Sequence, residues 1–348
     1  MPDPARERPS PDPDRALEEV LSRPTPEVIA AARDLAGDVL VLGCSGKMGP
    51  SLLRLLHRAV GDAGVASRVI GAARFSDPAL RQALERDGIP TVSCDLLDPA
   101  ALTALPDAPN VVLMAGQKFG STTDPAATWA TNTLLPGLVA QRFADARLVA
   151  FSTGNVYPLT PVGRGGSVET DPPGPIGEYA QSALGRERVL THLARRNGTP
   201  MAILRLNYAV EPRYGVLRDI ADRVRRREPL DLAMSHVNVI WQRDANAVAI
   251  RAFAHCAVPP VVLNVTGPDE VAVRDLATRF GRRFGTAPVF AGPERPTALL
   301  SNAARCRALF GPPPVSLEEM IDRVATWIEA GGRSLDQPTH YEEREGRF

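Results

Sequence analysis

Hydrophobic residues recur from Asp38 onward in two alternating patterns. Short runs of aliphatic and β-branched residues, typical of buried parallel strands, occur at 38–43, 67–73, 111–116, 146–153 and 201–207. Amphipathic stretches with the helical period lie between them at 50–60, 78–88 and 180–198. Because strands and helices alternate, the sequence predicts an α/β fold, a Rossmann-type doubly wound parallel sheet with helices on both faces.

The same pattern divides the chain into segments. The start of the chain is rich in Pro, Asp and Arg and cannot bury enough apolar surface to order itself. Capping by Thr25, Pro26 in the first turn and a stop at Gly37 predict a helix before the first strand. After about Asn207 the alternation loosens. We expect a disordered tail at 1–14, N-terminal helices at 15–37, the main sheet domain at 38–207, a smaller lobe with return segments to the sheet at 208–330, and a C-terminal tail at 331–348.

Composition and charge exclude several classes of protein. Forty basic residues balance forty acidic ones, which gives no basic excess for nucleic acid or a membrane surface. The four cysteines are scattered, so the sequence predicts neither a metal site nor a disulfide framework, and a cytoplasmic location is expected. No apolar run approaches the roughly 18 residues of a membrane span. Lys47 and Lys118 are the only lysines, because almost all basic charge is arginine.

A glycine-rich turn, "GCSGKMG", follows the first predicted strand and opens a helix. Glycines at this spacing permit a tight turn and let the backbone approach a pyrophosphate at the helix N-terminus. The turn therefore predicts a dinucleotide site, NAD or NADP, and makes 38–207 an NAD(P)-binding domain. Its candidate cofactor residues are Gly43, Ser45, Gly46, Lys47, Met48 and Gly49.

Further motifs follow in a fixed order: "CDLLD", "AGQKFG", "FSTGNVYP", "EYAQSALGRERVL" and "LRLNYAVEPR". In this order, from about Asp38 to residue 330, the chain resembles the extended short-chain dehydrogenase/reductase family, the NAD-dependent epimerase/dehydratases. The resemblance implies an NAD(P)-dependent enzyme with Thr153 and Tyr179 as catalytic residues. It also implies further cofactor contacts from Asp95, Leu96, Ala115, Gly116, Lys118, Asn132, Tyr179 and Asn207.

Two positions depart from the family pattern. The second strand normally ends in an acidic residue that binds the adenosine ribose, whereas this chain has Ala73 followed by Arg74. An arginine can pair with a 2′-phosphate, so Arg74 leans to NADP; the alternative is a solvated arginine at the start of a loop, and NAD remains open.

The second departure is at position 183, where Ala183 replaces the lysine of the Tyr-x-x-x-Lys motif. The resemblance implies that this lysine lowers the pKa of the catalytic tyrosine. Without it, a tyrosine of ordinary pKa is only about 0.1% ionised at pH 7. If the reaction needs the anion, forming it adds roughly 4 kcal/mol to the activation free energy. A neutral tyrosine is nevertheless the correct state for a general acid. Lys118 is the candidate for a third catalytic residue that partly substitutes; alternatively it only contacts the cofactor or is a solvated charge.

The lobe gives weaker indications about the substrate. The segment before "VNVIW" lacks the Gly-rich, Arg-containing stretch that holds the diphosphate in sugar-nucleotide members of the family, which favours a smaller sugar, cyclitol or hydroxy acid derivative. Candidate substrate contacts are Tyr208, Arg213 and His236.

Two functions follow from these patterns. The first is an atypical NAD(P)-dependent oxidoreductase or epimerase acting on a carbinol carbon of a polyol-like substrate. The second is a catalytically inactive NAD(P)-binding regulator or scaffold of the same fold. By analogy with the family, a homodimer is expected through helices around Asn132 and 183–193, unless the apolar face of the second helix packs on its own sheet.

Overall fold

The computed structural model describes residues 12–348. Its centre is a parallel sheet of seven strands in the order β12-β7-β5-β4-β1-β2-β3. The strands are β1 (Val39–Leu42), β2 (Val69–Ala73), β3 (Thr91–Ser93), β4 (Asn110–Leu113), β5 (Arg147–Thr153), β7 (Met201–Leu206) and β12 (Val261–Val265). The predicted doubly wound α/β fold is confirmed.

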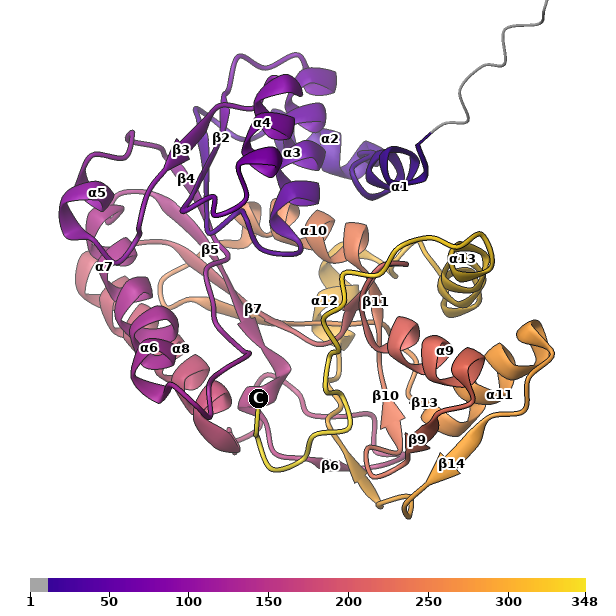
Figure 1. Ribbon diagram of the computed structural model, residues 1–348. Helices are drawn as coiled ribbons and strands as arrows, with labels where there is room; N and C mark the ends of the chain where they lie inside the picture. Colours follow the sequence, from indigo (N-terminus) through magenta and orange to yellow (C-terminus); the bar gives the residue numbers. More distant parts are fainter. Residues whose placement is uncertain (1–11) are drawn as a thin grey trace, which may run out of the picture.

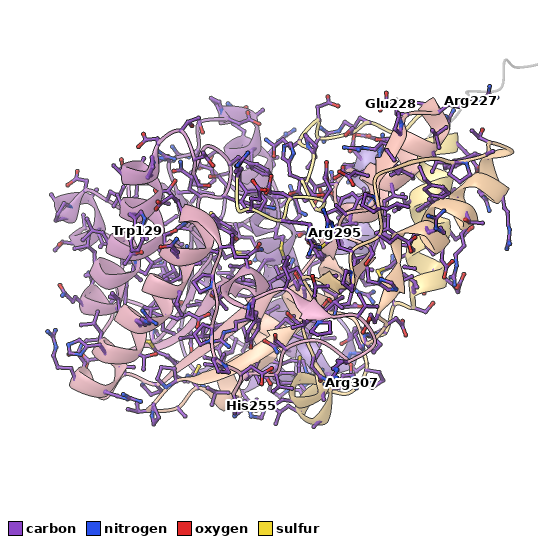
Figure 2. The ribbon with its side chains drawn as sticks, turned by 90° about the horizontal axis from the view of Figure 1, so that it is seen from below. Trp129, Arg227, Glu228, His255, Arg295 and Arg307 are labelled. Carbon is purple, nitrogen blue, oxygen red and sulfur yellow. The ribbon has the colours of Figure 1, made fainter. Side chains whose placement is uncertain are left out.

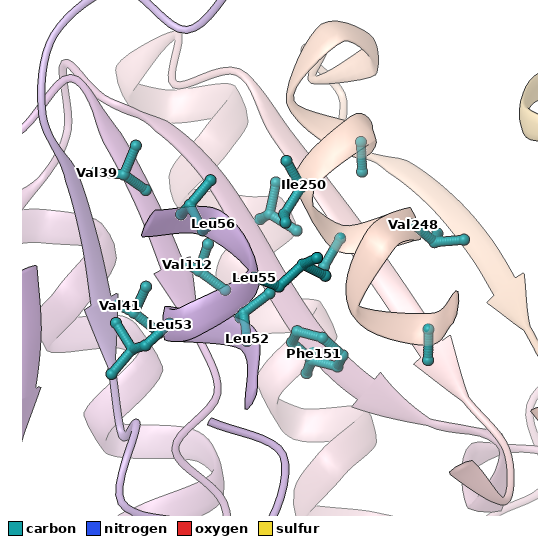
Figure 3. Close-up of a cluster of buried hydrophobic side chains, with 14 of the residues drawn as sticks. Val39, Val41, Leu52, Leu53, Leu55, Leu56, Val112, Phe151, Val248 and Ile250 are labelled. Carbon is teal, nitrogen blue, oxygen red and sulfur yellow. The ribbon is translucent and has the colours of Figure 1, made fainter. Parts of the chain in front are cut away.

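Helices cover both faces of the sheet (Figure 1). One face carries α2 (Pro26–Arg33), α3 (Gly49–Ala63) and α10 (Gln242–Arg251). The other carries α5 (Pro99–Thr103), α7 (Leu135–Arg142) and α8 (Gly177–Asn197), with α6 (Pro125–Trp129) and the π-helical turn η1 (Ala130–Leu134) against α8. α4 (Pro78–Arg86) lies beside β3. Figure 3 shows leucines of α3, among them Leu52 and Leu56, between the strand side chains of Val41 and Val112 and those of α10.

A second lobe has its own hydrophobic core. Its helices are α9 (Val216–Arg226), α11 (Val273–Phe284) and α13 (Leu317–Glu329), and its short strands include β9 (Pro229–Asp231), β10 (His236–Val237), β13 (Val271–Ala272) and β14 (Val289–Ala291). The chain crosses repeatedly between the halves, since β12 and α10 return to the sheet domain from this part of the sequence. Helix α1 (Pro13–Leu21) buries Leu17 and Leu21 in the core of the lobe.

Parts of both predicted tails are ordered in the structure. Residues 1–11 of the predicted N-terminal tail lie outside the described residues, and α1 begins at Pro13, inside that predicted segment. The C-terminal segment is packed: Thr339 and Tyr341 are buried, and the chain runs across the front of the molecule between the sheet domain and the lobe (Figure 1). We refer to residues 334–348 as the strap.

Candidate active site

The glycine-rich turn connects β1 to α3, as the sequence predicts. Gly43 has φ +79°, and a Cβ there would lie 2.5 Å from the backbone nitrogen of Ala115. A Cβ on Gly49 would lie 2.2 Å from the carbonyl oxygen of Cys44. By contrast, a Cβ on Gly46 would meet only the Gly43 oxygen, at 3.7 Å. The fold itself therefore requires Gly43 and Gly49, whereas Gly46 leaves open space in front of the turn.

That open space continues into a pocket of about 250 Å³ at the carboxyl edge of the sheet. The ends of β1, β2, β3 and β4 form it, which is where doubly wound folds bind nucleotides. Eight of the predicted cofactor residues line it: Gly43, Ser45, Gly46, Arg74, Asp95, Leu96, Ala115 and Gly116. Its shape and its backbone N–H groups fit the adenosine end of a dinucleotide.

Arg74 lies at the rim of this pocket. Its side chain is exposed and forms no ion pair with any residue from 12 onward, while its carbonyl oxygen accepts a hydrogen bond from Ser93 at 3.3 Å. Buried Ala73 occupies the end of β2, so no carboxylate stands at the place where the family binds the ribose.

A second pocket, of about 170 Å³, lies between the end of β5, the start of α8 and the lobe. Thr153 and Tyr179 both line it, and the Thr153 side chain acts to lower the pKa of Tyr179. Thr153 Oγ1 also accepts from the backbone and side-chain nitrogens of Asn155, at 3.1 and 3.0 Å. Burial raises the pKa of Tyr179, and the Thr153 side chain and the charge of Arg186 oppose that rise only in part. The phenol is therefore neutral near pH 7 and is suited to donate a proton.

Ala183 lies one turn after Tyr179 on α8 and is buried. Its neighbours are apolar or aromatic: Val156, Tyr157 and Leu184 form a small cluster with it. Position 183 therefore contributes packing to this cluster and no charge to the pocket.

Both lysines of the chain line the pocket of Thr153 and Tyr179. Lys118 Nζ donates to the carbonyl oxygen of Thr339 at 2.8 Å and lies 4.1 Å from the ring centroid of Phe348. Burial lowers the pKa of Lys118 to about 8, with Asp219 acting in the opposite direction.

Lys47 reaches the same pocket from the glycine-rich turn. Its Nζ donates to the carbonyl oxygen of Ala209 at 3.2 Å and lies 3.3 Å from the ring centroid of Tyr214. Burial lowers the pKa of Lys47 to about 7, while the charges of Glu211 and Asp219 oppose this. Sequence reasoning placed Lys47 only in the cofactor turn; the scarcity of lysine in an arginine-rich chain was the signal for a second amine.

The strap closes the side of the pocket that faces away from the glycine-rich turn. Thr339 donates from its backbone nitrogen to Asp219 of α9 at 2.8 Å while its oxygen accepts from Lys118, so it joins the two halves. Arg344 donates to the carbonyl oxygens of Ala233 and Thr297, at 2.8 and 2.6 Å, in the lobe.

At its far end the strap reaches the start of α8. Gly346 packs so closely on Ile176 that a Cβ would lie 2.2 Å from the Ile176 oxygen. The ring of Phe348 then contacts Tyr179 and Lys118. No feature of the sequence analysis placed this segment at the site.

Three other predicted residues lie near the pockets. Asn207 and Tyr208 line the second pocket together with Met48. Tyr208 has φ 45°, a left-handed conformation that is unusual for a tyrosine and is often found at functional sites. Asn207 donates to Asn238 Oδ1 at 2.8 Å, which fixes its amide against the lobe.

The remaining three lie away from both pockets. The side-chain amide of Asn132 uses its hydrogen-bonding groups within the protein, on Gln117, Ser182 and Arg186. These bonds hold the loop after β4 against α8. The guanidinium of Arg213 is taken up by Glu211, Glu18 and Asp14. His236 lies on β10, where its ring contacts the Ser235 hydroxyl.

The residues from 12 to 348 contain no group of three or more His, Cys, Asp or Glu side chains arranged to hold a metal ion. Within the same residues, no helix is long and apolar enough to cross a membrane.

Comparison with known proteins agrees with this geometry. The sequence matches the NAD dependent epimerase/dehydratase family over residues 39–236. No curated protein matches the chain.

Similar solved structures include a UDP-glucose 4-epimerase of Thermotoga maritima with UDP-glucose, at a TM-score of 0.70 and 19% identity, covering 84% of this chain and 99% of that one. A UDP-glucuronic acid 4-epimerase of Bacillus cereus in complex with NAD has a TM-score of 0.70 at 19% identity and the same coverage, 84% and 99%. A Thermus thermophilus UDP-glucose 4-epimerase complex with NAD has a TM-score of 0.67 at 21% identity, again covering 84% and 99%. At these identities the likeness concerns the fold.

Proposed function

The chain belongs to the NAD dependent epimerase/dehydratase family, and we propose that it is an atypical NAD(P)-dependent oxidoreductase or epimerase. Its substrate would be a sugar, cyclitol or related polyol that reacts at a carbinol carbon. The observation that carries this proposal is that Thr153 and Tyr179 line one pocket, together with both lysines of the chain.

The residues of the first pocket fit a nicotinamide dinucleotide. Gly46 provides the open approach for a pyrophosphate, and the similar Bacillus cereus and Thermus thermophilus structures contain NAD. When bound, such a cofactor supplies a hydride acceptor or donor. The exposed guanidinium of Arg74 and the absence of a carboxylate on Ala73 support a preference for NADP.

Around the reacting carbon, each side chain has a separate task. Tyr179 holds a proton at its phenol oxygen and gives it to the substrate oxygen when a carbonyl is reduced. Thr153 orients that oxygen through its hydroxyl. Lys118, half-buried at the edge of the pocket, assists by its positive charge, which stabilises negative charge on the substrate oxygen.

A small substrate fits the second pocket better than a sugar nucleotide does. Pockets for drug-sized ligands have volumes of about 300–1,000 Å³, whereas this pocket has about 170 Å³. Thr339 of the strap lines this pocket, so we expect a nucleotide attached to the sugar to collide with the strap.

The inactive regulator or scaffold is the second candidate function. The apolar surroundings of Ala183 and the contact of Phe348 with Tyr179 favour it, because both are compatible with a site that binds a dinucleotide without turnover.

One experiment separates the two functions. The purified protein would be titrated with NAD and NADP by calorimetry and then assayed at 340 nm with a panel of sugars, cyclitols and hydroxy acids. We expect turnover of one class, and a loss of at least about 100-fold in Tyr179→Phe, because general acid catalysis contributes on that scale. Tight nucleotide binding without turnover of any compound would instead support the regulator.

We further propose a homodimer through the outer face of η1, α7 and α8. Trp129 and Leu134 are exposed there, and Val189 of α8 lines the groove between these helices. Figure 2 shows Trp129 on the helical side of the sheet domain, far from Arg227 and Glu228 of the lobe. Leu190 and Leu193, in contrast, pack on the protein's own sheet.

A further inference from the structure

Arg186 of α8 is a buried arginine that forms no ion pair with a carboxylate within residues 12–348. Its side chain donates to the Phe151 carbonyl oxygen at 2.6 Å, and to the carbonyl and side-chain oxygens of Asn132 at 3.1 and 3.0 Å. All three acceptors are uncharged. A buried arginine normally has an anionic partner, because a lone charge is expensive to remove from water. The charge of Arg186 can therefore act on other groups near it.

The neighbouring Glu187 attracts the Arg186 charge but forms no ion pair with it. Its carboxylate accepts from Arg205 at 2.7 Å and from the Ser152 hydroxyl at 2.6 Å. Arg205 is thus a paired buried arginine close in space, and it serves as the natural contrast to Arg186.

The guanidinium of Arg186 lies against the cofactor-binding loop. A Cβ on Gly116 would be only 3.0 Å from Arg186 Nη2, and Gly116 lines the first pocket. A side chain at residue 116 would therefore press on the guanidinium. This contact places the charge next to a residue that lines the first pocket.

Helix geometry brings Arg186 back toward Tyr179. Residues 179, 183 and 186 share one face of α8, since residues three and four apart are neighbours on a helix. Long side chains lean toward the helix N-terminus, and Ala183 offers only a methyl group in their path. Consistent with this placement, the Arg186 charge lowers the pKa of Tyr179 against the larger effect of burial.

We propose that Arg186 is a positioning residue that supplies, from the next turn of α8, the fixed positive charge that Ala183 does not carry. The role of Arg186 in turnover rests on the proposed enzymatic function. Its effect on the pKa of Tyr179 does not depend on any substrate or reaction. The charge is permanent, because a guanidinium does not lose its proton in the working range of an enzyme, and it favours the phenolate of Tyr179 over the phenol.

The titration of Tyr179 tests this directly. The chain has five tyrosines, so a protein labelled with ¹³Cζ-tyrosine gives five signals, and Tyr179→Phe assigns the relevant one. In Arg186→Met the pKa of Tyr179 should rise, and in Arg186→Lys it should stay near the wild-type value. Because nearby charge changes proton-transfer rates, kcat of Arg186→Met should fall at least about tenfold, while the Kd for NAD changes less than about threefold.

A structural role alone predicts a different result. Ser182→Ala removes the 3.0 Å bond from Asn132 to Ser182 and the 2.9 Å bond from Ser182 to the Tyr179 carbonyl oxygen, so it loosens the same network without removing the charge. It should leave the Tyr179 titration unchanged. Adding Ala183→Lys to Arg186→Met should bring the Tyr179 pKa back down and restore part of kcat.

An unchanged Tyr179 titration in folded Arg186→Met overturns the proposal, and so does an equal rise in Ser182→Ala. If Arg186→Met does not fold, Arg186→Gln serves instead, because it removes the charge, keeps a polar group near the same acceptors and should also raise the Tyr179 pKa. The titration needs no substrate. A protein that shows these shifts but no turnover would therefore refute the proposed enzyme and leave the placement of the charge intact.

Discussion

The ring of Phe348 meets the ring of Tyr179 edge to face, with 5.8 Å between the centroids and 84° between the planes. The same Phe348 ring lies 4.1 Å from the ammonium of Lys118. One strap residue thus contacts two of the three candidate catalytic side chains. Thr339 of the same segment lines the pocket of Tyr179, so the strap borders the proposed substrate site.

Removing the contacts that hold the strap in place should allow larger substrates to bind. In Arg344→Ala the strap loses its hydrogen bonds to Ala233 and Thr297, and in Phe348→Ala it loses the ring over Tyr179. We expect each variant to bind UDP-glucose at least about tenfold more tightly than the wild type, measured by calorimetry with NAD present. Arg347→Ala, an exposed position in the same segment, is the matched control and should behave as the wild type. Strong binding of UDP-glucose by the wild type would contradict the small-substrate proposal.

Gly46→Val should abolish nucleotide binding while the protein stays folded. The protein leaves room for a side chain at this position, since the nearest atom to a Cβ is 3.7 Å away, so the added methyl groups occupy only the space of the pyrophosphate. Calorimetry with NAD and NADP measures the loss. Gly61→Ala, in exposed surroundings on α3, is the control and should bind normally. Unchanged affinity in Gly46→Val would mean that the nucleotide binds elsewhere.

Arg74→Ala tests the choice between the two cofactors. If the exposed guanidinium pairs with a 2′-phosphate, the variant should lose about 1–3 kcal/mol of NADP affinity, the range for charged hydrogen bonds, and little NAD affinity. The ratio of the two dissociation constants is the informative quantity. Equal losses for both nucleotides would show that Arg74 makes no phosphate contact.

The fold and the nucleotide pocket follow from local sequence patterns. Strands such as β1 are continuous apolar runs because both faces are buried, and a Gly-rich turn must follow if the chain is to enter α3 beside Ala115. These constraints act between neighbours in the chain. For that reason the glycine-rich turn could be located from the sequence alone, whereas Asp95, Leu96, Ala115 and Gly116 were named from the family resemblance.

The second pocket depends on contacts between distant residues, which no local pattern encodes. Lys47 bonds to Ala209, and Lys118 to Thr339. Arg213, predicted to contact the substrate, instead bonds to Glu18 of α1. Nothing in the sequence of α1 or of the strap indicates these partners. A charged helix or a segment of this length can pack against many different parts of a protein.

The homodimer proposal predicts the effect of a charge in the apolar groove of η1, α7 and α8. Leu134 is 56% exposed, so Leu134→Arg should leave the fold intact and convert the dimer to a monomer in light scattering at micromolar concentration. The control is Leu309→Arg, the same substitution at an exposed leucine on α12 (Ala304–Phe310), outside the groove. This variant should remain dimeric. A monomeric wild type would refute the proposal.

The last prediction concerns the two amines of the second pocket. Because the chain has only two lysines, a protein labelled with ¹³Cε-lysine gives two signals, and Lys118→Ala assigns them. We expect midpoints of about 7 for Lys47 and about 8 for Lys118, as burial disfavours the charged forms. Midpoints near the ordinary lysine value of about 10.4 would show that both side chains reach water.

These two titrations set the pH dependence of stability and of turnover. Both folded pKa values lie below the unfolded value of about 10.4, so the unfolded chain binds more protons above pH 7, and the free energy of unfolding should rise from pH 7 to 10.

Lys118 is charged below its midpoint of about 8, so its assistance to catalysis is present at low pH and is lost as the pH rises through that value. Turnover of Lys118→Ala should therefore fall below that of the wild type at pH 6–7 and approach it above pH 9. Ala183→Lys should partly restore the loss at low pH. If Lys118→Ala changes nucleotide affinity alone at every pH, Lys118 has no part in the chemistry.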